Sequence, residues 1–189
     1  NSLNYPRTSA DKIKENIDNL ARIDINLIDM LEQSQKERFG EITKKLVPQT
    51  TKPGKAVLVS GTNLQNLYEI LQKSKDMKLD IYTHSDLLIG HAFSVMEEFK
   101  NLKGHYGSCF SNCVLDFATF PGAILLTKNT YPNIEYLYRG KLFSAEEIPP
   151  KGVIQIKEDD YSPLFEAAME AKGFTHGREV EPVEVGYDK

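Results

Sequence analysis

Three short apolar runs, each ending in a small polar turn, constrain the fold of this chain more than any other feature. The segments are Leu58-Val59-Ser60-Gly61-Thr62, Ile81-Tyr82-Thr83-His84-Ser85-Asp86 and Leu125-Leu126-Thr127-Lys128-Asn129-Thr130. Short buried strands that alternate with helical patterns are typical of a parallel sheet covered by helices. Ligands bind such open sheets at the carboxyl ends of the strands, so these turns bear directly on function. Two of the three ends offer only a threonine hydroxyl.

From Lys55 onward a strand, turn and helix pattern repeats. It predicts strands at 56–60, 79–83, 105–108, 123–127, 136–142, 153–156 and 180–187, and helices within 64–71, 87–99, 109–120 and 164–171. Thr62 and Gln65 have the spacing of a capping box for the first helix, and Ser162 is expected to cap the last. The pattern predicts an α/β fold: a three-layer α/β/α, Rossmann-like, mostly parallel sheet.

An amphipathic helical arm is expected to precede the sheet. Residues 9–39 carry apolar side chains at spacings of three and four, namely Ile13, Ile17, Leu20, Ile23, Leu27, Met30 and Leu31. Gly40 is the expected end of this helix, and the prolines and glycine within 46–54 indicate a linker. We therefore expect a helical arm at 1–45, a linker at 46–54 and an α/β domain at 55–189, as a fragment of a longer chain.

Composition argues against two classes of partner. The 189 residues carry a net charge of −4 and no cluster of lysine and arginine, so the electrostatic signature of a nucleic-acid binder is missing. No run approaches the roughly 18 consecutive apolar residues of a membrane span, and the first residues do not resemble a signal peptide. We expect a cytoplasmic domain that binds neither nucleic acid nor membrane.

The two cysteines, Cys109 and Cys113, are four positions apart in a segment with a helical pattern. Their side chains would share one helix face, and the simplest interpretation is a pair of reduced thiols. A disulfide across one helical turn has poor geometry, and a metal site would need two further ligands that the neighbouring sequence lacks.

Several segments together resemble the middle domain of hybrid cluster proteins, the prismane or hydroxylamine reductase family, relatives of nickel carbon monoxide dehydrogenases. The matching segments are Gly54-Lys55-Ala56-Val57-Leu58-Val59-Ser60-Gly61, Tyr82-Thr83-His84 with Gly90-His91, Tyr106-Gly107, and Phe120-Pro121-Gly122-Ala123-Ile124-Leu125-Leu126-Thr127 with Asn129. The resemblance runs from about residue 10 to about residue 172, and it implies a Rossmann-like domain of an iron–sulfur oxidoreductase.

The resemblance also implies that this domain supplies a histidine, a glutamate and a cysteine to an iron–sulfur–oxygen hybrid cluster completed by later domains. Carried over by position, the histidine corresponds to Thr62, the glutamate to Asp86 and the cysteine to Thr130. Only Asp86 keeps a ligand-type side chain. A threonine hydroxyl keeps its proton near neutral pH, whereas thiolates or neutral imidazoles hold such clusters. We therefore expect no complete metal site and no cofactor in this chain.

Two functions remain open. The chain is either part of a hydroxylamine reductase-like oxidoreductase whose cluster is completed elsewhere, or a non-catalytic binding or scaffold domain that kept the fold and lost the ligands. Catalysis by this chain alone is not expected in either case. Its expected partners are the remaining domains of the parent protein and a second copy bound through the apolar helix, because an exposed apolar stripe favours association.

Other polar residues favour structural roles. His84 and His91 match family positions that are not cluster ligands, so hydrogen bonding is the simplest role, with proton transfer beside Asp86 as the alternative. His105 and His176 are expected in loop or edge positions, and the sequence shows no partner for either. The turn from Ser60 to Asn63 has one glycine and no lysine, which argues against a phosphate site.

Overall fold

The computed structural model describes residues 9–107, 110–127 and 135–188. The chain divides into two compact units, Asn1–Gly40 and Glu41–Lys189. The predicted boundaries of arm, linker and α/β domain stay predictions. Among the described residues, no helix combines the length and the apolar character that crossing a membrane requires.

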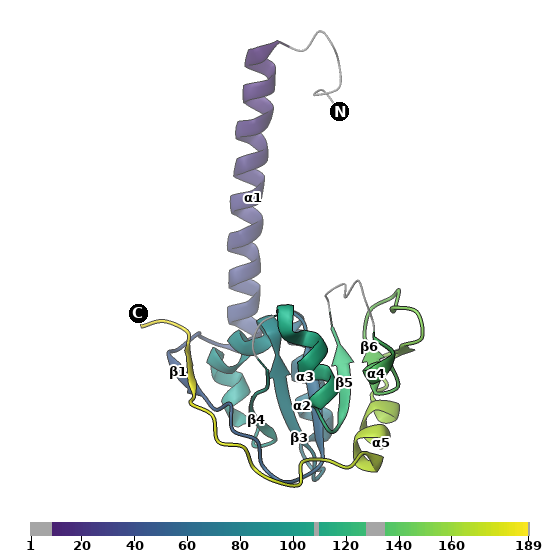
Figure 1. Cartoon of the computed structure of the whole chain (residues 1–189). Helices are drawn as coiled ribbons and strands as arrows, with labels where there is room; N and C mark the ends of the chain where they lie inside the picture. Colours follow the sequence, from purple (N-terminus) through teal and green to yellow (C-terminus); the bar gives the residue numbers. More distant parts are fainter. Residues whose placement is uncertain (1–8, 108–109, 128–134, 189) are drawn as a thin grey trace. The chain divides into compact units, whose positions relative to one another are not determined.

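The first unit is the long helix α1 (Ala10–Phe39), drawn in purple in Figure 1. The Ser9 side chain caps it by accepting a hydrogen bond from the amide of Lys12, and the helix ends at Gly40, as predicted. Taken by itself, the helix leaves most of its apolar side chains more than half exposed: Ile17, Leu20, Ile23, Ile25, Leu27, Ile28, Met30 and Leu31. Helix α1 therefore has the predicted apolar residues but buries few of them.

The second unit is built on a six-stranded parallel sheet with the order β4-β3-β2-β5-β6-β7. The strands are β2 (Ala56–Ser60), β3 (Asp80–His84), β4 (Leu102–His105), β5 (Ala123–Leu126), β6 (Leu142–Ser144) and β7 (Ile154–Gln155). This is the classic doubly wound order, with the chain reversing its direction of winding between β2 and β5. Every residue of β2 is buried, as expected for the centre of a sheet covered on both faces.

Helices cover both faces of this sheet (Figure 1). They are α2 (Leu64–Ser74), α3 (Cys113–Thr119), α4 (Tyr136–Arg139) and α5 (Ser162–Glu170), with 3₁₀ helices η2 (Ser85–Ala92), η3 (Ser94–Glu98) and η4 (Phe110–Asn112). Phe117 of α3 and Tyr138 of α4 pack with Leu58, Tyr82 and Ile124 on one face. Tyr161, which precedes α5, joins that helix to α2 by donating to Glu69 and accepting from Asn66. The predicted three-layer α/β/α fold is confirmed.

A second, two-stranded sheet joins the ends of this unit. Strand β1 (Lys45–Val47) pairs in antiparallel register with β8 (Val183–Val185). Single bridges link Thr51 to Arg178 and Gly54 to Phe174, so the C-terminal segment runs back along residues 45–54 (Figure 1). The strand predicted at 180–187 is therefore present in part, outside the main sheet.

Three expectations about local structure are wrong. Residues 136–142 do not form a strand, because Tyr136 to Arg139 make one helical turn in which only Tyr138 is buried, against Phe117. The helix expected within 87–99 is replaced by η2 and η3. The strand expected at 105–108 lies earlier, at β4.

Both predicted helix caps are also wrong. The cap of α2 is Asn63 rather than Thr62, because the Asn63 side chain accepts from the amides of Gln65 and Asn66. Helix α5 begins after Tyr161, and the amide of Ser162 donates to the carboxylate of Asp160. In each case the amide hydrogen bonds are accepted by a polar side chain one or two positions before the predicted cap or after it, namely Asp160 or Asn63.

Candidate functional site at the carboxyl edge of the sheet

The carboxyl ends of β2, β3, β4 and β5 form one edge of the sheet, which we call the carboxyl edge. It comprises Ser60–Asn63, His84–Asp86, His105–Gly107 and Thr127. The reversal between β2 and β5 lies here, and this is where doubly wound folds bind their ligands.

The structure brings two of the three ligand positions to this edge. Thr62 follows β2 and Asp86 lies in η2 after β3, and both residues are exposed. The two strands are neighbours whose last residues, Ser60 and His84, are paired in register. Thr130 follows β5 in the sequence and lies outside the described residues.

The turn after β2 is filled by the side chain of Thr127. The hydroxyl of Thr127 donates to the carbonyl of Ser60 at 3.0 Å and accepts from the amide of Asn63 at 3.3 Å. Gly61 has φ +128°, and a Cβ at that position would lie 2.2 Å from the Thr127 hydroxyl. The amides of Gln65 and Asn66 are already bound by Asn63. Three of the amides that a phosphate could use at this turn, those of Asn63, Gln65 and Asn66, are therefore bound within the protein.

A buried histidine network occupies the adjacent ends of β3 and β4. His84 Nδ1 lies 2.8 Å from the Ser60 hydroxyl, and His84 Nε2 lies 3.3 Å from Asp116 Oδ2 on α3. The hydroxyl of Thr83 lies 2.9 Å from His91 Nε2 and 3.0 Å from His105 Nδ1. The rings of His84 and His105 are stacked, with their centroids 6.3 Å apart.

Burial sets the charge of this network. It lowers the pKa of His91 to about 3, with repulsion from His105 and Lys45 acting in the same direction. It also lowers the pKa of His105 to about 4, where repulsion from His84 adds and attraction to Asp116 opposes. Both rings are therefore neutral at neutral pH and serve as hydrogen-bonding groups inside the fold.

Close approach at Gly107 allows the contact between α3 and β3. Gly107 has φ +89°, and a Cβ there would lie 2.6 Å from Asp116 Oδ2 and 2.8 Å from a ring carbon of His84. A larger residue would separate the carboxylate from the imidazole. The matched Tyr106-Gly107 motif thus has a packing role at this edge.

The sequence prediction for these histidines is confirmed in part. His84 and His91 have the expected hydrogen-bonding role, but the carboxylate next to His84 is Asp116, not Asp86. His105 ends the edge strand β4, as expected, but it is buried there and bonded to Thr83, a partner that the sequence did not show. His176 lies outside the helices and strands, as expected. Sequence alone gave no signal for Asp116, which lies 32 positions from its partner.

The described ligand positions do not present the full donor set that the family resemblance implies. Asp86 keeps a carboxylate, but Thr62 presents a hydroxyl, which does not replace an imidazole beside sulfide. Within the described ranges, no three His, Cys, Asp or Glu side chains are grouped closely enough to hold a metal ion.

Of the two cysteines, Cys113 begins α3 as a free thiol, and Cys109 lies outside the described residues. Burial, assisted by the charge of Asp116, raises the pKa of the Cys113 thiol and so disfavours the thiolate that a metal would require.

Comparison with known proteins assigns the chain to a family. The model of the prismane/CO dehydrogenase family matches residues 6–187. The chain is 34% identical over 165 residues to a hydroxylamine reductase of Thermodesulfovibrio yellowstonii, covering 87% of this chain and 31% of that protein. A hydroxylamine reductase of Acidiphilium cryptum is 32% identical over 170 residues, covering 90% of this chain and 30% of that protein.

A third relative, the hydroxylamine reductase of Methanocella arvoryzae, is 30% identical over 167 residues, covering 88% of this chain and 31% of that protein. The chain thus spans slightly less than one third of the length of these relatives. The doubly wound sheet and the family match across nearly every residue lead to the same assignment: the chain belongs to the prismane/CO dehydrogenase family.

Proposed function

We propose that this chain is a domain of a hydroxylamine reductase-like oxidoreductase in which two of the three cluster-ligand positions of this domain, Thr62 and Thr130, have been replaced. The domain then holds no complete hybrid cluster of its own. The proposal is supported by the named relatives, which are hydroxylamine reductases. Its key observation is that Thr62, an exposed residue after β2, stands where the family resemblance expects an imidazole.

Metal analysis of the parent protein tests the enzymatic part of this proposal. Iron, acid-labile sulfide and the visible absorption spectrum would be measured on the anaerobically purified parent protein, together with hydroxylamine reduction by a chemical reductant. We expect the parent protein to contain iron and sulfide, held by ligands from its other domains. A colourless parent protein without iron and without reductase activity would contradict the oxidoreductase assignment.

Asp86 is the one retained ligand-type residue at the described ligand positions, and it has its own test. If the parent cluster reaches this edge, Asp86→Asn lowers its iron content or changes its spectrum. The matched control is Asp76→Asn, which removes an equally exposed carboxylate beyond the end of α2. Equal spectra and iron contents in both variants would remove Asp86 from the ligand set.

The alternative function is a scaffold or binding domain that has lost the cluster. The filled turn at Thr127 favours this alternative for the β2 edge, because the amides of Asn63, Gln65 and Asn66 are already bound there within the protein. Restoring histidine at position 62 and cysteine at position 130 would recover no cluster in such a protein. Recovery of iron and sulfide in the double variant of the parent protein would count against the scaffold function.

We further propose that the apolar stripe on α1 is covered by the remaining domains of the parent protein. In the isolated chain, the same stripe would pair with a second copy, because Leu20, Leu27 and Leu31 are each more than half exposed within their own unit. Sedimentation would then show dimers that dissociate in the variant Leu20→Glu/Leu27→Glu. A strictly monomeric chain at all concentrations would contradict the self-association.

A cytoplasmic location is proposed with this function. Its support is the free thiol of Cys113, since reduced cysteines are the rule in that compartment. Fractionation of cells that express the parent protein tests it, and recovery of the protein with periplasmic markers would contradict it.

A further inference from the structure

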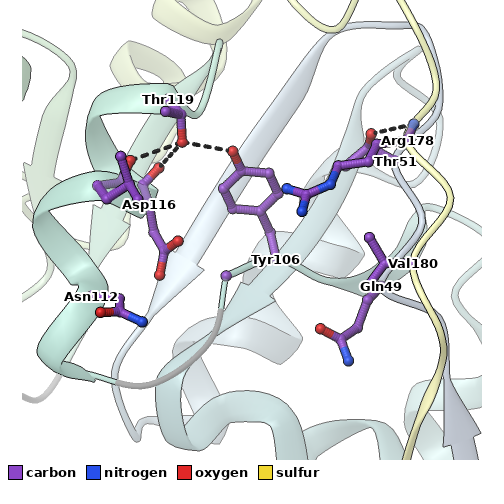
Figure 2. A pocket seen from close by; sticks show the side chains of 10 residues that line it. Gln49, Thr51, Tyr106, Asn112, Asp116, Thr119, Arg178 and Val180 are labelled. Atoms are coloured by element: carbon purple, nitrogen blue, oxygen red, sulfur yellow. Dashed lines mark hydrogen bonds between the residues drawn. The ribbon is translucent and has the colours of Figure 1, made fainter.

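A cavity of about 390 Å³ opens beside Asp116, away from the positions that correspond to cluster ligands. Figure 2 shows its walls: α3 on one side, the C-terminal segment on the other and Tyr106 between them. The lining residues are Gln49, Thr51, Tyr106, Gly107, Asn112, Leu115, Asp116, Thr119, Arg178 and Val180. The volume lies in the range of pockets that bind small molecules.

Two opposite charges face this cavity from its two sides. The carboxylate of Asp116 comes from α3, and the guanidinium of Arg178 comes from the C-terminal segment, beyond the ring of Tyr106 (Figure 2). Among the residues that the structure describes, the Arg178 guanidinium has no hydrogen bond or ion pair, and its neighbours along the wall are uncharged. The cavity therefore has a negative end and a positive end.

The framework of the cavity is fixed by hydrogen bonds behind the lining side chains. His84 holds the carboxylate of Asp116 from the buried side at 3.3 Å. The hydroxyls of Tyr106 and Thr119 lie 2.9 Å apart, which ties the floor to α3. The amide of Arg178 donates to the buried side chain of Thr51 at 3.1 Å. Preorganised groups of this kind lower the entropic cost of binding.

We propose that this cavity binds a small zwitterion, an amino acid with an apolar or aromatic side chain. The carboxylate of the ligand pairs with Arg178, since guanidinium and carboxylate match in geometry and charge. The ammonium group of the ligand pairs with Asp116, and its side chain lies against the Tyr106 ring, Leu115 and Val180. This binding needs no cluster and is independent of the proposed reductase function.

Titration of the full 189-residue chain with L-phenylalanine tests the proposal. Binding is measured by calorimetry and by changes in the NMR signals of Tyr106 and of the His84 ring nitrogens. Two matched probes each lack one charge: 3-phenylpropionate has no ammonium group, and 2-phenylethylamine has no carboxylate. We expect saturable binding of phenylalanine with a Kd of about 1 mM or tighter, and binding about tenfold weaker for each analogue. The His84 signals shift with phenylalanine because its ammonium group contacts Asp116.

Two variants separate the two ends of the cavity. Arg178→Gln weakens phenylalanine binding about tenfold and leaves 2-phenylethylamine binding unchanged. Asp116→Asn also weakens phenylalanine binding about tenfold, but it leaves 3-phenylpropionate binding unchanged. Arg178 is exposed, so its variant tests the proposal even if Asp116→Asn disturbs folding. The control is Lys172→Gln, which removes an exposed positive charge near the same segment. Failure of phenylalanine to saturate, equal binding of all three probes, or unchanged binding in Arg178→Gln would each overturn the proposal.

Discussion

The two halves of the carboxyl edge use different side chains as hydrogen-bond partners for their polar groups. At the ends of β2 and β5, the hydroxyl of Thr127 and the side chain of Asn63 satisfy the backbone of the turn, and Thr62 is left exposed. At the ends of β3 and β4, imidazoles satisfy buried hydroxyls, and His84 and His105 are almost completely enclosed.

This difference teaches that histidines near a ligand-binding edge need not be ligands. The ring nitrogens that could bind a metal lie inside the protein, where four of them are within hydrogen-bond distance of Ser60, Thr83 or Asp116. The exposed positions on the same edge carry oxygen donors instead. Imidazole at this edge therefore stabilises the fold, and the exposed positions Thr62 and Asp86 present oxygen atoms only.

Lowering the pH should destabilise the protein through the buried histidines at the ends of β3 and β4, and this is the largest effect that we expect. His91 and His105 titrate near their ordinary pKa of 6.5 when unfolded, but at about 3 and about 4 when folded. Below pH 6.5 the unfolded chain therefore binds more protons, and stability falls as the pH is lowered. We expect each histidine to remove about 2 kcal/mol of unfolding free energy between pH 8 and pH 5. Urea denaturation across this range measures the loss.

Variants identify the source of this acid sensitivity. His105→Gln should remove about half of the dependence on pH, because Gln does not titrate and His91 remains. His176→Gln provides the control, since His176 is exposed and should leave the slope unchanged. The same slope in the wild type and in His105→Gln would contradict the assignment of the effect to the buried network.

A methyl group at Gly61 should destabilise the turn after β2, which the Thr127 hydroxyl fills. Gly61→Ala would place its Cβ against the Thr127 hydroxyl, in a backbone conformation that alanine avoids, so we expect a loss of about 3 kcal/mol. Gly140→Ala is the matched control, because a Cβ there meets nothing within 4 Å, and it should be nearly neutral. Equal stability of the two variants in denaturant would show that the turn is not filled as described.

Removal of the Thr127 hydroxyl should have a smaller effect. Thr127→Val keeps the shape of the side chain but leaves the amide of Asn63 without its acceptor, at a cost of about 1.5 kcal/mol. Thr127→Ser, which keeps the hydroxyl, should recover most of this loss in the same denaturation experiment. If Thr127→Val were as stable as the wild type while Thr127→Ser lost stability, the methyl group rather than the hydrogen bonds would hold the turn.

Much of the fold could be predicted because its signals are local. The fully apolar β2 and the three-and-four spacing along α1 identify a buried strand and an amphipathic helix without reference to the rest of the chain. The segment from Tyr136 to Tyr138 misled the prediction because its aromatic residues favour a strand, whereas packing of Tyr138 on Phe117 and the nearby Gly140 favour a single helical turn.

The candidate site was harder to predict because its contacts are distant in sequence. Ser60, His84 and Asp116 come from two strands and a helix, and no pattern along the chain indicates that they meet. Likewise, the threonine that holds the β2 turn is Thr127 rather than the predicted Thr62. Its hydroxyl donates to the carbonyl of Ser60, which lies 67 positions away along the chain. The carboxyl edge was predictable, but its hydrogen-bond partners depend on the folded geometry.

The most direct test of the account is the iron and sulfide content of the 189-residue chain after anaerobic reconstitution with ferrous iron and sulfide. With hydroxyl and carboxylate donors at its described ligand positions, the chain should retain far less than one iron per molecule after desalting and should show no charge-transfer absorption. Stoichiometric iron and sulfide that are lost in Thr62→Val or Asp86→Asn would contradict the proposal that this edge holds no complete cluster.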